Sequence, residues 1–335
     1  MRPSWAWGIL FLCGMAATAA WCGRAHSGDC GVAVNGGLRV EGTRLVNERG
    51  EPVQLRGMSS HGLHWYPQYT SRRSIHETKR HGANLFRLAM YADSVEGGYS
   101  ESAKAAEKNR RILFAGIENA LAEDMYVIVD WHLLKDADPL RLVHNAVPFF
   151  REVTEKYPNH PAILYEICNE PNGDTTWGQI RAYAELVIPA IRAASPDAIV
   201  LVGTPEWSSR VEAALEAPLE HANVMYTYHL YTGFTNYEFG KMLDGVRAQG
   251  LPVFVSEWGI SRDLDTGELD LEEGKAFVRY MRANMLSWAN WSLSNKDEDF
   301  SALRPDVTAL EGWTDADLTE SGKLVFEALR GGEYR

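Results

Sequence analysis

Basic residues are in the minority in this 335-residue chain. Lys and Arg number 33 against 45 Asp and Glu, so the net charge is −12. Nucleic acids and anionic membranes bind basic surfaces, and neither is an expected partner. Cysteine is also scarce: four residues do not make a disulfide framework, and one of them, Cys168, falls in a predicted buried strand. This composition suits a neutral substrate.

Apolar runs of membrane-spanning length are missing as well, with the partial exception of residues 5–20. That stretch follows Arg2, is short for a membrane span, and ends in small residues, as a secretory signal peptide does. We predict a signal peptide over residues 1–25, cleaved between positions 19 and 25. The exported domain, residues 26–335, would then reach the periplasm or the medium with no membrane contact. A retained membrane anchor is the alternative.

No segment rich in Pro, Ser and Gly divides the chain, so a single domain is expected. Short apolar runs of strand character instead alternate with segments of helical periodicity. The eight runs begin near Val53, Ala83, Tyr126, Ala162, Ala198, Asn223, Leu251 and Ser287. Such alternation predicts an α/β fold whose parallel sheet closes into a (β/α)₈ TIM barrel. A doubly wound open sheet is the alternative, but no Gly-rich phosphate loop follows the first strand.

Helices are expected between most of these strands. The clearest covers residues 103–124, where apolar side chains recur on one face. The others are expected over residues 71–81, 139–157, 175–194, 237–250, 271–284 and 319–329, with only a short helix after Trp207. Pro189 should kink its helix or begin a new turn. Ahead of the barrel, residues 38–40 and 44–46 predict a small hairpin that could plug its bottom.

Two predicted strands end in glutamate. Residues 163–170 begin as a buried apolar strand and end in Asn169-Glu170, where Pro171 can no longer donate to the ladder. A second apolar strand ends in Glu257. The C-terminal ends of barrel strands meet at one face, where catalytic groups gather. Two carboxyl groups at that face are what acid-catalysed cleavage of a glycosidic bond through a covalent intermediate requires.

The other strand ends carry polar and aromatic side chains. They read His61 to Tyr66, Tyr91, Asp130 to His132, Glu206-Trp207, His229 to Tyr231 and Trp288 to Trp291. Any single His or Trp could be part of the core, but polar and aromatic side chains recur at every strand end, and this recurrence favours a functional site.

Arg87 stands inside an otherwise apolar strand. Because an unpaired guanidinium is very costly to bury, it needs a carboxylate partner. We expect that partner to be Glu257, which Arg87 would hold ionised and aimed as a nucleophile. A purely structural ion pair is the alternative.

A zinc site is the main rival interpretation, since His61, His64, His132 and His229 all lie near strand ends. The spacing is unfavourable: His61 and His64 are three residues apart, so on a strand they would face opposite sides. We therefore expect no metal and no cofactor.

The ordered set of motifs resembles glycoside hydrolase family five, and within it the bacterial endo-β-1,4-glucanases, over residues 37–329. These motifs are Leu55 to Trp65, Phe86 to Tyr91, Val129 to His132, Tyr165 to Gly173, Met225 to Tyr231, Phe254 to Gly259 and Trp288 to Lys296. The resemblance implies a catalytic domain over residues 26–335, without a separate carbohydrate-binding module.

The resemblance also implies roles for the catalytic residues. Glu170 would be the proton donor and then the general base, Glu257 the nucleophile, and Asn169 the partner of the sugar 2-hydroxyl. The remaining catalytic group comprises Arg87 and Tyr231, which would support the nucleophile, and His132 and His229, which would line the site and position Glu170.

Further residues would hold the sugar chain. Trp291 would form the floor beside the cleaved bond, and Trp65 and Trp207 would help it hold a glucan in an open cleft. The other implied binding residues are His61, Tyr66, Tyr91, Lys296 and Glu298. Glu206 and the loop 232–236 depart from the usual family pattern, which leaves the chain-position preference open.

Together these observations predict a monomeric, retaining endoglucanase (cellulase) that acts on β-1,4-glucan, with its two carboxyl groups about 5–5.5 Å apart. The same chemistry on mannan, xylan or xyloglucan is the nearer alternative. A metal-dependent barrel hydrolase and a non-catalytic sugar-binding barrel are the more distant ones.

Overall fold

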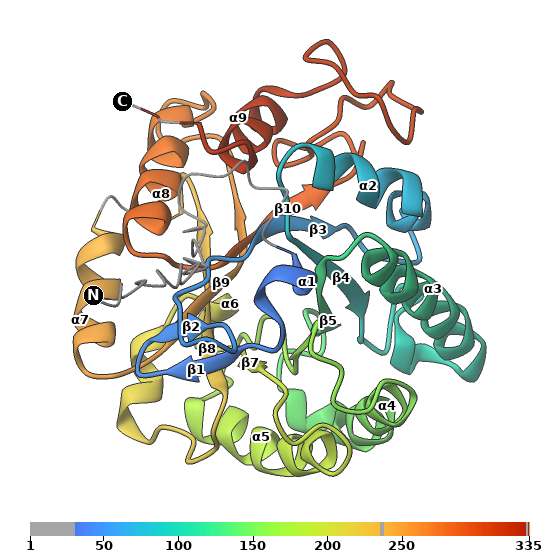
Figure 1. Cartoon of the computed structure of the whole chain (residues 1–335), viewed down its shortest axis with the longest axis vertical. Coiled ribbons are helices and arrows are strands. Elements are labelled where there is room, and N and C mark those ends of the chain that lie inside the picture. Colours follow the sequence, from blue (N-terminus) through green and yellow to red (C-terminus); the bar gives the residue numbers. More distant parts are fainter. Residues whose placement is uncertain (1–30, 235–237, 333, 335) are drawn as a thin grey trace, which may run out of the picture.

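Eight parallel strands close into a barrel in this computed structural model, which describes residues 31–234, 238–332 and 334. The strand order around the barrel is β10-β3-β4-β5-β6-β7-β8-β9. The strands are β3 Arg56–Ser60, β4 Leu85–Tyr91, β5 Tyr126–His132, β6 Ile163–Glu166, β7 Val200–Val202, β8 Val224–Tyr231, β9 Val253–Gly259 and β10 Trp288–Leu293. Helices ring the barrel on the outside (Figure 1). The predicted (β/α)₈ fold is confirmed, and the predicted signal peptide lies outside the described residues.

The helices between the strands agree with the predicted segments, except that the short helix expected after Trp207 is a 3₁₀ helix and the segment labelled α6 has a non-helical backbone at Glu206 and Trp207. They are α2 Arg72–Arg80, α3 Ala103–Ala122, α4 Val143–Lys156, α5 Trp177–Arg192, α6 Pro205–Ser208, α7 Phe239–Ala248, α8 Leu271–Ala283 and α9 Glu320–Leu329, after a first short helix, α1 Val32–Asn35. Short 3₁₀ turns cover Pro67–Thr70, Tyr99–Glu101, Pro139–Leu142 and Val211–Glu216. Helix α5 runs through Pro189 to Arg192 as one element, so the expectation that Pro189 begins a new turn is wrong.

Side-chain caps fix where several helices begin. Ser71, Ser102, Asp270 and Thr319 each accept a hydrogen bond from a backbone N–H in the first turn. Thr176 and Gln179 form a reciprocal capping box at the start of α5. These bonds satisfy N–H groups that a helix start otherwise leaves unpaired.

The predicted hairpin is present as strands β1 Arg39–Glu41 and β2 Arg44–Val46, paired antiparallel. Its residues Leu38 and Leu45 share one apolar cluster with residues from the N-terminal ends of the barrel strands, including Leu85 and Leu164. Tyr126 ties the preceding segment to the barrel by donating a hydrogen bond from its hydroxyl to the carbonyl of Gly36, at 2.7 Å. The hairpin thus closes the N-terminal end of the barrel.

The barrel interior changes character along the strand direction. On β4 the alternate residues run from apolar Leu85 through Arg87 to Tyr91, and on β6 Leu164 is followed by Glu166. All five are buried. Because alternate strand residues face the same side, one end of the barrel is filled by apolar groups while charged and then aromatic groups fill the other. The site is therefore confined to the C-terminal end.

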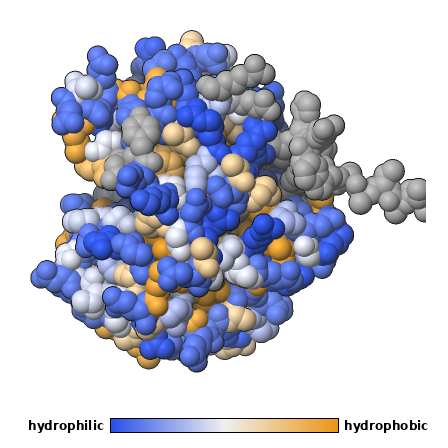
Figure 2. All heavy atoms as spheres, turned by 90° about the vertical axis from the view of Figure 1, so that its left-hand side faces the viewer, coloured by the Kyte–Doolittle hydropathy of each residue, from blue (hydrophilic) through white to orange (hydrophobic). Residues whose placement is uncertain are grey.

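On the face drawn in Figure 2, hydrophilic residues alternate with small apolar groups. In the described part of the chain, no helix combines the length and the apolar character needed to cross a bilayer.

Candidate active site

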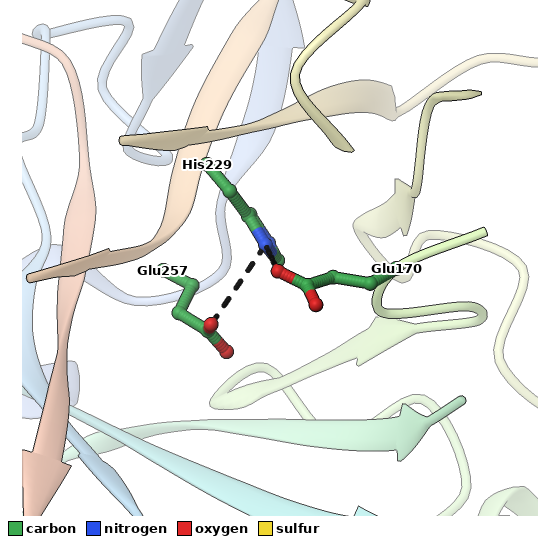
Figure 3. Close-up of side chains that lie close together, drawn as sticks. All are labelled: Glu170, His229 and Glu257. Atoms are coloured by element: carbon green, nitrogen blue, oxygen red, sulfur yellow. Dashed lines mark hydrogen bonds and ion pairs between the residues drawn. The ribbon is translucent and has the colours of Figure 1, made fainter. Parts of the chain in front are cut away.

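Glu170, His229 and Glu257 converge at the C-terminal end of the barrel (Figure 3). His229 on β8 lies between the two glutamates: its Nδ1 is 2.8 Å from Oε1 of Glu170 and 3.9 Å from Oε1 of Glu257. The β8–β9 register, which pairs His229 with Glu257, produces this arrangement. One carboxylate oxygen of each glutamate lies within 4.8 Å of the other. The two glutamates found in the sequence therefore form a close pair.

Glu257 is held from two sides. Arg87 donates from Nη1 to Oε2 at 2.9 Å, and the Tyr231 hydroxyl donates to Oε1 at 2.7 Å. Burial alone would raise the pKa of this carboxyl, but the positive charges of His229 and Arg87 outweigh burial and hold it below its ordinary value. Glu257 is thus an ionised, oriented carboxylate, and the predicted contacts with Arg87 and Tyr231 are both present.

Glu170 has different surroundings. Burial and the nearby negative charge of Glu257 raise its pKa, although His229 opposes them. Strand β6 is shorter than expected and ends at Glu166, so Glu170 lies beyond it. The backbone N–H of Glu170 positions this residue by donating a hydrogen bond to the carbonyl of Leu133 at 3.2 Å. A carboxyl that keeps its proton at higher pH can act as an acid.

Arg87 binds more carboxylates than the sequence reasoning assigned to it. Besides Glu257, its Nε donates to Oε2 of Glu166 at 2.7 Å, and its Nη2 lies 2.9 Å from Oδ2 of Asp130. Nη2 also donates to Oδ1 of Asn169 at 2.6 Å. All of these side chains are almost fully buried. Glu166 was missed, although a lone acid inside an apolar strand is the natural complement of a lone Arg in another.

His132 is part of the same network on its β5 side. Its Nδ1 lies 2.7 Å from Oδ2 of Asp130, and its Nε2 lies 3.3 Å from Nδ2 of Asn169. Burial and the charge of Arg87 lower the pKa of His132 to about 3, so the ring is neutral. Of the two histidines predicted to position Glu170, His229 therefore contacts it directly, whereas His132 contacts Asn169.

Predicted binding residues form one aromatic surface beside the glutamates. Trp291, whose peptide bond to Ser292 is cis, stacks on His132 with ring centroids 5.1 Å apart. His61 lies 5.0 Å from Trp291, and Tyr91 lies 4.3 Å from His132. The surface continues outward from His61 and Tyr91 to Tyr66 and Trp65. Trp65 is 40% exposed, so this surface reaches solvent.

Lys296 and Glu298 lie at the edge of that aromatic surface. Their side chains form an ion pair at 2.6 Å, and both approach Nε2 of His61, at 3.4 and 3.7 Å. Burial and the charge of Lys296 lower the pKa of His61 to about 3. A neutral imidazole, an ammonium and a carboxylate thus stand together at the rim.

Trp207 lies apart from that surface, on the Glu170 side. Glu206, Trp207 and Ser208 all have positive φ, between 53° and 57°, which is uncommon for residues other than glycine. The Trp207 N–H donates to the carbonyl of Pro171, and the Ser208 hydroxyl donates to the carbonyl of Asn169. These bonds hold the turn against the Glu170 segment and leave the Trp207 side chain 53% exposed.

Glu206 and the loop 232–236 are the two places where the sequence departs from the usual family pattern. Glu206 is exposed on the same turn and pairs with Arg210 at 3.1 Å. The loop 232–236 lies only partly within the described residues, which end at Phe234 and resume at Glu238.

The four histidines considered for zinc do not converge. His64 turns away, with Nε2 2.9 Å from the carbonyl of Glu96, and His132 contacts Asp130. Across residues 31–234 and 238–332, one set of three potential ligands does come together: the pair of glutamates with His229. Glu257 already accepts hydrogen bonds from Arg87 and Tyr231 there, and the fixed positive charge of Arg87 opposes a second cation.

The family model for "Cellulase (glycosyl hydrolase family 5)" matches residues 46–297. An endoglucanase of Clostridium saccharobutylicum is 40% identical over 299 residues, and endoglucanase A of Butyrivibrio fibrisolvens is 41% identical over 296. Each alignment covers 88% of this chain but only 65% and 68% of the relative, so the chain spans about two thirds of these proteins.

Solved structures give the same match. A thermostable, halotolerant GH5 cellulase from an Icelandic hot spring isolate superposes with a TM-score of 0.82 at 36% identity, covering 91% of this chain and 98% of that one. The catalytic domain of a Thermobifida fusca endoglucanase, in complex with cellotetraose, superposes with a TM-score of 0.82 at 31% identity, covering 91% of this chain and 100% of that one.

Proposed function

The chain belongs to glycosyl hydrolase family 5, and we propose that it is a retaining endo-β-1,4-glucanase, a cellulase that cleaves internal bonds of cellulose or related β-glucans by double displacement. The observation that carries the proposal is the pair of adjacent glutamates with opposite surroundings: His229 and Arg87 lower the pKa of Glu257, whereas burial and the charge of Glu257 raise the pKa of Glu170.

The first displacement uses both glutamates together. A carboxylate oxygen of Glu257 attacks the anomeric carbon while Glu170 gives its proton to the glycosidic oxygen, so the C–O bond breaks and the leaving sugar departs as an alcohol. Arg87 and Tyr231 keep the attacking carboxylate aimed. Asn169, fixed by Arg87, would bond the sugar 2-hydroxyl, a contact that strengthens in the transition state.

The second displacement reverses the roles. A water molecule enters where the leaving sugar was. Its oxygen attacks the anomeric carbon while Glu170 takes one of the water protons, and the bond from that carbon to Glu257 breaks, which releases Glu257 as a carboxylate. Retention follows from two inversions. The close approach of the two carboxylates supports it, because a direct single displacement needs carboxyl groups about 6.5–9.5 Å apart, with room for water between them.

The lining of the site supports a polysaccharide substrate. The aromatic surface from Trp291 to Trp65 offers apolar faces on which sugar rings can stack, and Trp207 offers another beyond Glu170. Two such flanks suit a chain that extends on both sides of the cleaved bond. We propose that the enzyme acts as an exported monomer on neutral β-glucan, without metal or cofactor, through a catalytic domain that follows a signal peptide cleaved between positions 19 and 25.

The test is hydrolysis of soluble cellulose by the purified mature protein beside the Glu257→Gln variant. Release of reducing ends together with a rapid fall in viscosity supports an endo-acting glucanase, and ¹H NMR should show the β-anomer as the first product. If cellulose stays intact but mannan, xylan or xyloglucan is cut, the chemistry stands and the substrate assignment fails. If no polysaccharide is shortened, the enzyme proposal fails.

A further inference from the structure

His229 has a second partner on the side away from Glu170. Its Nε2 lies 3.1 Å from the hydroxyl of Ser256 on β9. Ser256 in turn donates to Oε1 of Glu166 at 2.7 Å, while the other oxygen of Glu166 accepts from Nε of Arg87. A buried chain of four groups thus leads from Glu170 through the imidazole and the hydroxyl to Glu166.

The number of protons available to these four groups decides which group donates and which accepts in each hydrogen bond. An ionised carboxylate can only accept hydrogen bonds, and a serine hydroxyl has one proton to give. Arg87 keeps Glu166 ionised, so Ser256 spends its proton on Glu166. The Ser256 oxygen can then only accept from His229, which requires a hydrogen on Nε2. The remaining nitrogen, Nδ1, is left to face Glu170.

We propose that Ser256 and Glu166 are positioning residues that keep a proton on Nε2 of His229, so that Nδ1 and Glu170 share one exchangeable proton during the acid–base cycle. The inference rests on the proposed function, because it concerns how Glu170 holds its proton. In either state, neutral or cationic, the Nε2 hydrogen stays in place. Only the proton between Nδ1 and Oε1 is free to be given up.

The environment of the imidazole supports this sharing. Its Nε2 is 3.9 Å from Oε1 of Glu166, so the negative charge on that carboxylate stabilises a cationic ring through the intervening hydroxyl. The charged groups that act on His229 come from β5, β6 with its C-terminal extension, and β9. They are Asp130, Glu166, Glu170 and Glu257, and Arg87 on β4 pairs with three of them, Asp130, Glu166 and Glu257.

Replacing Ser256 by alanine tests the relay, because it removes the acceptor of the Nε2 hydrogen but leaves both contacts of Glu257. The shared proton is then held less tightly and should leave at lower pH. We expect the alkaline limb of kcat/KM to move down by about one pH unit, the scale of one lost hydrogen bond to a charged group. The acid limb, which reports ionisation of Glu257, should stay in place.

Two variants accompany this measurement. Ser256→Thr keeps the hydroxyl and should restore the alkaline limb. Ser60→Ala removes another buried barrel hydroxyl, one that accepts from the N–H of Ala89, and should leave the profile where it is. A Ser256→Ala variant that loses activity equally at every pH would show a structural role only and overturn the proposal.

A second readout does not depend on activity. The experiment is ¹⁵N NMR of the full-length protein with labelled histidine, in which the His229 signals are assigned by their loss in His229→Gln. Nε2 of His229 should stay protonated throughout the pH range in which Nδ1 exchanges its proton. An unprotonated Nε2 in the neutral ring refutes the relay, even in an active enzyme. If the wild type cleaves no glucan, the proposed function fails, while the NMR result still decides the proton positions.

Discussion

The surroundings of the two glutamates differ although the side chains are the same. Glu257 accepts hydrogen bonds from a guanidinium and a phenol, and its side chain is 6% exposed. Within the described part of the chain, Glu170 has one side-chain hydrogen bond, to His229, and is 12% exposed. Two carboxyl groups whose oxygens approach within 4.8 Å thus receive opposite pKa shifts.

The difference shows how position assigns chemical roles. Like charges so close together cannot both ionise freely, so whichever carboxyl has the better donors takes the negative charge. His229 and Arg87 supply the positive charge that lowers the pKa of Glu257, and Arg87 bonds to Glu257 while making no hydrogen bond to Glu170 among the described residues. The roles of nucleophile and acid therefore follow from the cations and donors gathered around Glu257.

Replacing each glutamate in turn should have the largest effect on activity and should show the difference between the two roles most clearly. Glu257→Gln should lower kcat/KM by at least ~10³-fold on every substrate, the scale on which loss of a nucleophile acts in other enzymes. Glu170→Gln should act selectively, because an aryl cellobioside with a good leaving group needs no proton from an acid. A burst of released phenol followed by slow turnover is expected in Glu170→Gln alone. A burst in Glu257→Gln would reverse the assignment.

Replacing Arg87 by methionine should weaken the distinction between the carboxyls and destabilise the fold. Glu166, Asp130 and Glu257 lose their shared cation, which we expect to lower the free energy of unfolding by about 3–5 kcal/mol, the cost of breaking buried pairs. Thermal or urea unfolding measures this. The control is Arg304→Met, which removes a solvent-exposed pair with Asp306 and should cost less than ~1 kcal/mol. Equal losses in the two variants would contradict the account.

A milder change, Tyr231→Phe, should sharpen the comparison. It deletes one donor to Glu257 but keeps Arg87, so the pKa of that carboxyl rises toward its ordinary value. Because the nucleophile must be ionised, the acid limb of kcat/KM should move to higher pH, by up to about one unit. The alkaline limb, set by Glu170 and His229, should not follow it. A shift of both limbs would mean that Tyr231 acts on the whole network.

The smallest effect is expected at the rim. Trp207→Ala removes an exposed ring on the Glu170 side, so it should raise KM a few-fold for long glucans, which extend past the cleaved bond, and less for short ones. Leu186→Ala, at an equally exposed position on α5, is the matched control. An equal rise for all chain lengths would show that Trp207 supports the Glu170 segment instead of holding sugar.

Much of this site could be predicted from strand ends and from resemblance. Glu170, Glu257 and the pairing of Arg87 with Glu257 follow from polar residues at buried positions, which need partners. Glu166 could not be predicted in the same way, because it lies inside a strand and its role depends on the β5–β6 register that places it beside Asp130. Such a register is a property of the closed barrel.

The backbone conformation at two places in the site also could not be predicted from the sequence. The strand predicted to reach Glu170 ends at Glu166, because the chain continues by bonds to Trp131 and Leu133 instead of as a regular ladder. The left-handed turn that carries Trp207 could not be predicted, because none of its positive-φ residues is a glycine. Its cause is tertiary: hydrogen bonds from Trp207 and Ser208 to the Glu170 segment.

The most direct test of the account is the titration of the two carboxyls themselves. Side-chain ¹³C NMR on glutamate-labelled protein, with Glu170→Gln and Glu257→Gln used for assignment, gives the order in which they ionise in the free protein. We predict that Glu257 ionises first, below the ordinary glutamate pKa, and Glu170 above it. If Glu170 ionised first, the division of roles drawn from Arg87 would be wrong.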